Sequence, residues 1–193
     1  MLDTYAREGK GADAVIIACF GDPGLFALRE LAPVPVVGMA EASCHLASTL
    51  GRKFSIVTGG HRWGPMLEEF VAAIGLATNL ASVRTVESGG ADIAAKPDVA
   101  LEGLALECRS AVTNDGAEVV ILGGLGLAGL AERVHAEVGV PVIDNVAASV
   151  RMAEAAATLG AAKARSGSFA AATPVKTTGL APALAALLEG RES

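Results

Sequence analysis

Residues 13–43 contain D-A-V-I-I-A-C-F-G-D-P-G-L, a helix-like run, and then V-P-V-V-G-M-A-E-A-S. Residues 118–149 contain E-V-V-I-L-G-G-L-G-L-A-G-L, a helix-like run, and then V-P-V-I-D-N-V-A-A-S, so one inserted residue aligns the two stretches. Each copy has the pattern of a strand, a turn, a helix and a second strand. We therefore predict two similar α/β halves with a small-ligand site between them. The copies differ at the turn, where the first carries the thiol of Cys19 and the second, at Gly124, carries glycines.

Strand-like apolar runs alternate with helix-like segments along the rest of the chain. Unalternating runs such as 14–18 and 54–57 are typical of strands that are covered on both faces. Strands separated by helices favour a parallel sheet. We predict an α/β fold of two pseudo-symmetric, Rossmann-like parallel-sheet halves with an interdomain cleft. The first half would comprise residues 1–50 and 150–193, and the second half residues 51–149.

The composition excludes several classes of protein. Of the 193 residues, 52% are hydrophobic but only 4% aromatic, and the net charge is −6 without a block of like charges. Nucleic-acid binding needs a basic face, which this composition does not offer. No apolar run reaches the roughly 18 residues of a membrane-spanning helix, and the first residues lack a signal-peptide pattern. The three cysteines form no C-x-x-C pair, so we expect reduced thiols in a cytoplasmic protein without a membrane partner.

Cys19 is the candidate for thiol chemistry. It follows a predicted buried strand, and ligands of parallel α/β sheets gather at the carboxyl ends of strands. Asp22 and Pro23 have the pattern of an N-cap and a first helical residue, so backbone N–H groups and the helix dipole would favour a thiolate. The alternative is that Cys19 is a small apolar residue packed at the strand end. Cys44 and Cys108 lie among apolar residues of predicted helices and are expected in the core.

A second hypothesis comes from the glycine-rich turn. The run from Gly124 to Gly129 follows a strand, precedes a helix and matches G-x-G-x-x-G, with Asp144 20 positions after its first glycine. This is the pattern of a dinucleotide site, as in a nicotinamide-dependent oxidoreductase. Too few residues follow Asp144 for the rest of a nucleotide-binding sheet. The first copy also lacks the glycines, which favours glycines that keep a turn open.

The loop from Thr58 to Trp63 follows another predicted strand and offers a hydroxyl, two glycines, His61 and Arg62. It would bind a substrate oxygen or form a solvated loop, and the residues alone leave both interpretations open. The sequence contains no H-E-x-x-H, G-x-S-x-G, P-loop or metal-spaced Cys/His set. We therefore expect neither a metal site nor a serine-hydrolase mechanism.

Five motifs stand out: I-I-A-C-F-G-D-P-G-L, F-S-I-V-T with a later R-W-x-P, I-L-G-G-x-x-L-A-G-L-A, V-P-V-I-D-N-V-A-A-S-V and a late T-G-L. Together they resemble the hydantoin racemase group of the Asp/Glu racemase superfamily. The resemblance implies two α/β domains around a site that uses no cofactor and no metal. It implies a small-molecule substrate, such as a 5-substituted hydantoin, allantoin or an amino-acid derivative, and a homo-oligomer. It also implies one cysteine from each half, which exchange a proton on opposite faces of an acidic carbon.

Carried onto this sequence, the resemblance assigns a role to each residue of the first turn. Cys19 takes the place of the first catalytic cysteine, and Phe20, Gly21 and Asp22 shape its turn. Thr58 corresponds to a threonine on the ligand side.

The second catalytic cysteine falls at Gly124, so Gly124, Leu125 and Gly126 would line the substrate without a side-chain acid. Three functions therefore stay open. The first is a racemase in which water or another group serves the second face. The second is a one-thiol decarboxylase or isomerase that works through an enolate, as single-cysteine members of the superfamily do with malonates. The third is a non-catalytic binder of a small ligand.

The beginning of the sequence is a second departure from the family pattern. Family members open with a strand and an Asn/Thr-containing loop, whereas this sequence opens within the helix before the Cys19 strand. Either the start of the sequence is misassigned or the first half lacks its initial βα unit. That absence would expose a strand edge and apolar helix faces.

Overall fold

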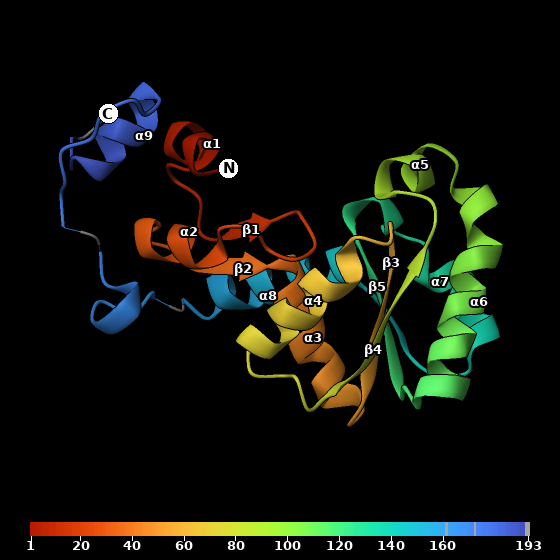
Figure 1. The fold of residues 1–193 in the computed structure, drawn as a ribbon. Coiled ribbons are helices and arrows are strands. Elements are labelled where there is room, and N and C mark those ends of the chain that lie inside the picture. Colours follow the sequence, from red (N-terminus) through yellow and green to blue (C-terminus); the bar gives the residue numbers. More distant parts are fainter. Residues whose placement is uncertain (161, 172, 192–193) are drawn as a thin grey trace. The chain divides into compact units, whose positions relative to one another are not determined.

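The computed structural model describes residues 1–160, 162–171 and 173–191. Short runs of Val, Ile and Leu form its strands, and segments with an apolar stripe form its helices. The chain divides into two compact units (Figure 1). The smaller unit comprises Met1–Ile17, Pro23–Val37 and Met152–Ser193, and the larger comprises Ala18–Asp22 and Gly38–Arg151.

A four-stranded sheet forms the centre of the larger unit. Its strand order is β4-β3-β5-β6, and all three neighbouring pairs are parallel. Parallel strands need long crossover connections, which the helices of the unit provide. The strands are β3 (Phe54–Gly59), β4 (Leu80–Val86), β5 (Val119–Gly123) and β6 (Val142–Asp144). The helices are α3 (Met39–Leu50), α4 (Trp63–Ala73), α5 (Gly90–Ala95), α6 (Pro97–Asp115), η1 (Leu125–Leu127), α7 (Ala131–Val138) and the start of α8 (Asn145–Thr158).

Two apolar cores lie on opposite faces of this sheet. Helices α3 and α4 cover the face that carries Ile56 and Ile121, whereas α6 and α7 cover the face that carries Val57 and Leu122 (Figure 1). The two faces alternate along each strand because successive side chains point to opposite sides. Strands β3 and β5 are buried along their whole length, which explains why their sequences are apolar without alternation.

The smaller unit contains a two-stranded sheet and short helices. Arg29 links two of its elements, because its Nε and Nη2 donate to the carbonyl of Val36 at 3.1 and 3.0 Å and its guanidinium lies 5.7 Å from the Phe169 ring centre. The strands are β1 (Val15–Ile17) and β2 (Val36–Gly38), and the helices are α1 (Leu2–Glu8), α2 (Leu25–Leu31), η2 (Gly167–Phe169) and α9 (Pro182–Leu188).

The prediction of an α/β fold with a sheet in each of two halves is confirmed. In the second copy, the 3₁₀ turn η1 separates β5 from α7, which begins only at Ala131. The predicted domain boundaries, after residues 50 and 149, stay a prediction.

Candidate active site

The turn after β1 presents Cys19 to solvent and fixes its neighbours. Gly21 and Asp22 have positive φ angles of 101° and 48°, and the N–H of Asp22 donates to the carbonyl of Cys19 at 3.0 Å. A Cβ at Gly21 would lie 3.4 Å from the Trp63 ring, so the turn packs closely on the start of α4. Cys19 is exposed, whereas Phe20 and Asp22 are buried. The thiol is therefore accessible on a turn that its neighbours hold in place.

Asp22 caps α3 rather than the helix that follows it. Its Oδ1 accepts from the N–H of Ala40 at 2.9 Å, and its Oδ2 accepts from the N–H of Glu41 at 2.8 Å. Both amides lie in the first turn of α3, where no carbonyl of the helix can reach them. The predicted N-cap role of Asp22 toward the next helix is wrong. That helix, α2, begins at Leu25 after Gly24 in the left-handed conformation and has no side-chain cap.

Gly38 makes room for this carboxylate, because a Cβ at that position would overlap Oδ2 of Asp22. In the second sequence copy the aligned residue is Asp144, and its Oδ1 accepts from the N–H groups of Val146 and Ala147 at 2.9 and 3.0 Å. The equivalent helix amides of the two copies therefore bond carboxylates from different sequence positions. In the first copy the carboxylate comes from Asp22, so its hydrogen bonds connect the Cys19 turn to α3.

The buried Asp22 is expected to make stability depend on pH. Burial raises its pKa from 3.8 to about 6, although the N–H groups of Glu41 and Ala40 act in the lowering direction. The unfolded chain loses this proton near pH 3.8 and the folded chain near pH 6, so folding is favoured below this window. The group then costs up to about 3 kcal/mol of stability as pH rises from about 4 to 6. Denaturant unfolding of wild type and Asp22→Asn between pH 4 and 7 should show this difference in slope. Parallel curves would contradict the prediction.

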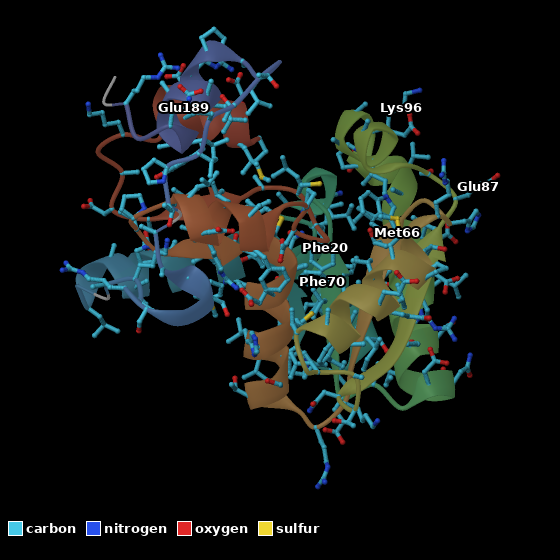
Figure 2. All side chains as sticks on the ribbon, turned by 60° about the vertical axis from the view of Figure 1, so that its left-hand side comes forward. Phe20, Met66, Phe70, Glu87, Lys96 and Glu189 are labelled. Carbon is cyan, nitrogen blue, oxygen red and sulfur yellow. The ribbon has the colours of Figure 1, made fainter. Side chains whose placement is uncertain are left out.

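The ring of Phe20, which Figure 2 labels, connects the first turn to the second. A Cβ at Gly123 would lie 2.5 to 2.8 Å from Phe20 ring carbons, so only glycine fits beneath the ring. The next residue, Gly124, has a φ of 135°, which residues with side chains rarely adopt. A Cβ at Gly124 would lie 3.8 Å from Oγ1 of Thr58. Cys19 and Gly124 are thus the sequence neighbours of the two residues in contact, Phe20 and Gly123. The Thr58 hydroxyl lies near the second turn.

Strand register explains the position of Thr58. It lies opposite Gly123 on β5 and opposite Thr85 on β4, so three carboxyl-end positions form one row across the sheet. Thr58 is buried, whereas His61 and Arg62 of the following loop are exposed. Nδ1 of His61 lies 3.0 Å from Oγ1 of Thr85. The hydroxyl of Thr58 therefore lies near the second turn, whereas the imidazole of His61 contacts β4.

Comparison with known proteins identifies the family. Residues 1–153 match the family model described as Asp/Glu/Hydantoin racemase. The chain belongs to this family. A hydantoin racemase of Pseudomonas sp. (strain NS671) is 44% identical over 153 residues, which are 79% of this chain and 61% of that relative. A hydantoin racemase of Rhizobium meliloti is 39% identical over 163 residues, which are 84% of this chain and 68% of the relative.

The fold comparison agrees with this assignment. The structure of allantoin racemase from Klebsiella pneumoniae superposes with a TM-score of 0.88 and 34% identity, over 95% of this chain and 75% of that one. The racemase family that the five motifs indicate is thus confirmed. The match to the Pseudomonas relative spans about three fifths of that relative's length.

In this member of the Asp/Glu/hydantoin racemase family, the glycine-rich turn has a packing role. A dinucleotide site would need an α-helix opening on the glycines and a free carboxylate at Asp144. Instead, the 3₁₀ turn η1 follows the first glycine, and a Cβ at Gly126 would overlap the carbonyl of Gly90. Oδ2 of Asp144 accepts from the N–H of Gly129 and its Oδ1 caps α8. These contacts disfavour the nicotinamide hypothesis.

The other two cysteines lie in the core of the racemase-family fold, as predicted. Cys44 and Cys108 have no exposed surface. Burial raises the pKa of the Cys108 thiol to about 12 and raises that of Cys44 as well. Neither is suited to form a thiolate at neutral pH. Cys19 is thus the accessible thiol of the three.

Asn145 is a residue that sequence reasoning missed. It follows β6 and has no exposed surface, and neither of its amide atoms has a hydrogen-bond partner among the described residues. An unpaired buried amide costs about 1–3 kcal/mol, so it is uncommon in folded proteins. The aligned residue of the first copy is Met39, which is buried and apolar. That polar-for-apolar difference between the copies is the signal that could have found Asn145.

Within residues 1–160, 162–171 and 173–191, no group of three or more His, Cys, Asp or Glu side chains could hold a metal ion. Over the same ranges, no helix combines the length and apolar character needed to cross a bilayer.

Proposed function

We propose that this chain removes and returns the α-proton of a small carbonyl-flanked carbon acid, with Cys19 as the acid–base thiol. The substrate class is a 5-substituted hydantoin, allantoin or an amino-acid derivative. Membership of the Asp/Glu/hydantoin racemase family supports the reaction type. Cys19 is exposed whereas Cys44 and Cys108 are fully buried, which supports the assignment of Cys19 as the reactive thiol.

The observation that carries the proposal is the contact between Phe20 and Gly123. It joins the turn that holds Cys19 to the turn at Gly124, so a ligand beside the thiol also faces the second turn. The thiolate of Cys19 would take the α-proton and become a thiol, which leaves an enolate on the substrate. The Thr58 hydroxyl, which would lie 3.8 Å from a Cβ at Gly124, would donate to the developing oxyanion.

Contacts of the substrate with the second turn belong to the proposal as well. Gly124, Leu125 and Gly126 would line the ligand, and Leu125 is 54% exposed. Phe20, Gly21 and Asp22 would act by shaping the first turn. A cytoplasmic location and a homo-oligomer remain predictions.

A second candidate function follows from the missing side chain at Gly124. Without an acid on that turn, the enolate would be reprotonated from one face only. One-sided enolate chemistry, such as decarboxylation or isomerisation, fits this arrangement. A binder that kept the fold without turnover is the third possibility.

Hydrogen exchange in D₂O separates these functions. Hydantoins, allantoin and amino acids are incubated with the protein, and deuterium at the α-carbon and optical rotation are followed together. We expect exchange on the cyclic ureides. Loss of rotation at the same rate would support racemisation, whereas exchange with retained rotation would support one-sided chemistry. Ligand binding without exchange would leave the binding role and overturn the proposed catalysis.

A further inference from the structure

The buried carboxamide of Asn145 has no role in the mechanism derived above. Its Nδ2 and Oδ1 both lack hydrogen-bond partners within the described part of the chain. The charged neighbour Asp144 does not supply one, because its two oxygens accept from backbone N–H groups. An amide that carries one acceptor and two donors is thus enclosed without a partner.

Sheet register places Asn145 at the carboxyl edge that holds the proposed site. β6 ends at Asp144, which lies opposite Leu122 on β5, and Asn145 begins α8 directly after that strand end. Ile143 before it and Ala148 after it belong to the core that contains Phe20, as does its aligned residue Met39. Asn145 therefore lies at the end of the sheet that also carries Thr58 and the Phe20–Gly123 contact.

The sequence copies show that the fold does not require an amide here. Met39 holds the aligned position before α3 and is buried without a polar group. Both residues occupy the first position of their helices, α3 and α8. An apolar side chain is thus compatible with this backbone, which points to the ligand rather than the fold as the reason for Asn145.

We infer that Asn145 hydrogen-bonds the cis-amide edge of a cyclic ureide and selects such rings over free amino acids. The inference rests on the proposed function and names its substrate class. A hydantoin ring presents an N–H beside a C=O, so it donates to Oδ1 and accepts from Nδ2. A free amino acid has no planar edge of this kind, because its carboxylate offers acceptors only and its ammonium donors are separated from them by the tetrahedral α-carbon. Because the amide has no exposed surface without ligand, we expect the neighbouring turn at Gly124 to shift on binding.

Binding of methylated rings tests this inference without relying on turnover. Calorimetry would compare hydantoin with 1-methylhydantoin and 3-methylhydantoin, each of which lacks one N–H. We expect one of the two methyl isomers to bind wild type about 10- to 100-fold more weakly than hydantoin. In Asn145→Leu, which has similar volume and no polar group, that discrimination should disappear. Equal affinity of wild type for all three rings, or no binding of any of them, would overturn the inference.

Stability and a control variant separate ligand recognition from a structural role. Asn145→Leu removes an unpaired amide, so its Tm without ligand should equal or exceed that of wild type. Met39→Leu, the aligned change in the first copy, should leave discrimination among the three rings unchanged. A lower Tm of Asn145→Leu with unchanged discrimination would show a structural amide and overturn the inference. If hydantoin exchange is absent but ring discrimination depends on Asn145, the proposed catalysis fails and the recognition stands.

Discussion

Replacing Cys19 with serine is expected to slow α-hydrogen exchange of an accepted ureide by about 10²–10⁴-fold, the usual effect of a positioned acid–base group. Serine keeps a side chain of similar size but replaces the thiol with a hydroxyl, which is a poor base at neutral pH. Because the Cys19 side chain is exposed, the substitution should leave Tm close to that of wild type. Deuterium incorporation measured by NMR, with Tm measured on the same samples, checks both parts.

The matched control for this variant is Cys108→Ala. It removes a thiol from the core between the sheet and α6, so it should lower stability while exchange per folded molecule stays unchanged. Alkylation offers an independent measurement, since iodoacetamide should modify Cys19 before the two buried cysteines. Wild-type exchange rates in both Cys19→Ser and Cys19→Ala would remove this thiol from the mechanism.

Replacing Gly38 with alanine is expected to destabilise the protein by about 3–5 kcal/mol. The new Cβ would overlap the carboxylate of Asp22 and displace it from the amides of Ala40 and Glu41. Hydrogen bonds to a charged group contribute about 1.5–3 kcal/mol each, and the displaced groups would lie buried without partners. Exchange should fall too, because the Cys19 turn loses its tie to α3. Denaturant unfolding measures the first effect and the D₂O assay the second.

A double-mutant cycle shows whether Asp22 is the cause. In an Asp22→Ala background, Gly38→Ala should cost only about 1 kcal/mol, because the carboxylate that it displaces is already gone. Gly64→Ala in α4 is the control for adding a methyl group to a glycine, since no other group lies within 4 Å of its Cβ. It should leave stability unchanged or slightly higher. Additive costs of the two changes at positions 22 and 38 would refute the proposed coupling.

The repeated strand–turn–helix–strand pattern predicted the fold class and the place of Cys19, because apolar periodicity is local in sequence. Buried strands such as β5 are recognisable from their composition alone. Hydrogen-bond partners that are distant in sequence cannot be predicted from such local patterns. Asp22 has the local pattern of an N-cap, and only the folded chain brings Ala40 and Glu41 to its carboxylate, 18 and 19 residues away.

The glycines illustrate the same limit. The spacing of Gly124, Gly126 and Gly129 matches a phosphate-binding pattern, yet the reason for Gly126 is the carbonyl of Gly90, a close approach that no spacing rule contains. Asn145 was missed because an asparagine at a helix start is ordinary in sequence. Its lack of partners is a property of the folded chain.

The interchange of carboxylates between the two sequence copies has a consequence for how this chain can evolve. Position 38 accepts a side chain only if position 22 gives up its acid, and the reverse change leaves the amides of α3 uncapped. Passage between the two arrangements therefore crosses an intermediate with either two carboxylates or none at one helix end. Because either intermediate would be less stable, we expect Asp22 and Gly38 to be retained or replaced together in descendants of this sequence. At the second turn, Asp144 caps α8 from its own strand, so substitutions at Gly124 face no comparable constraint from that helix.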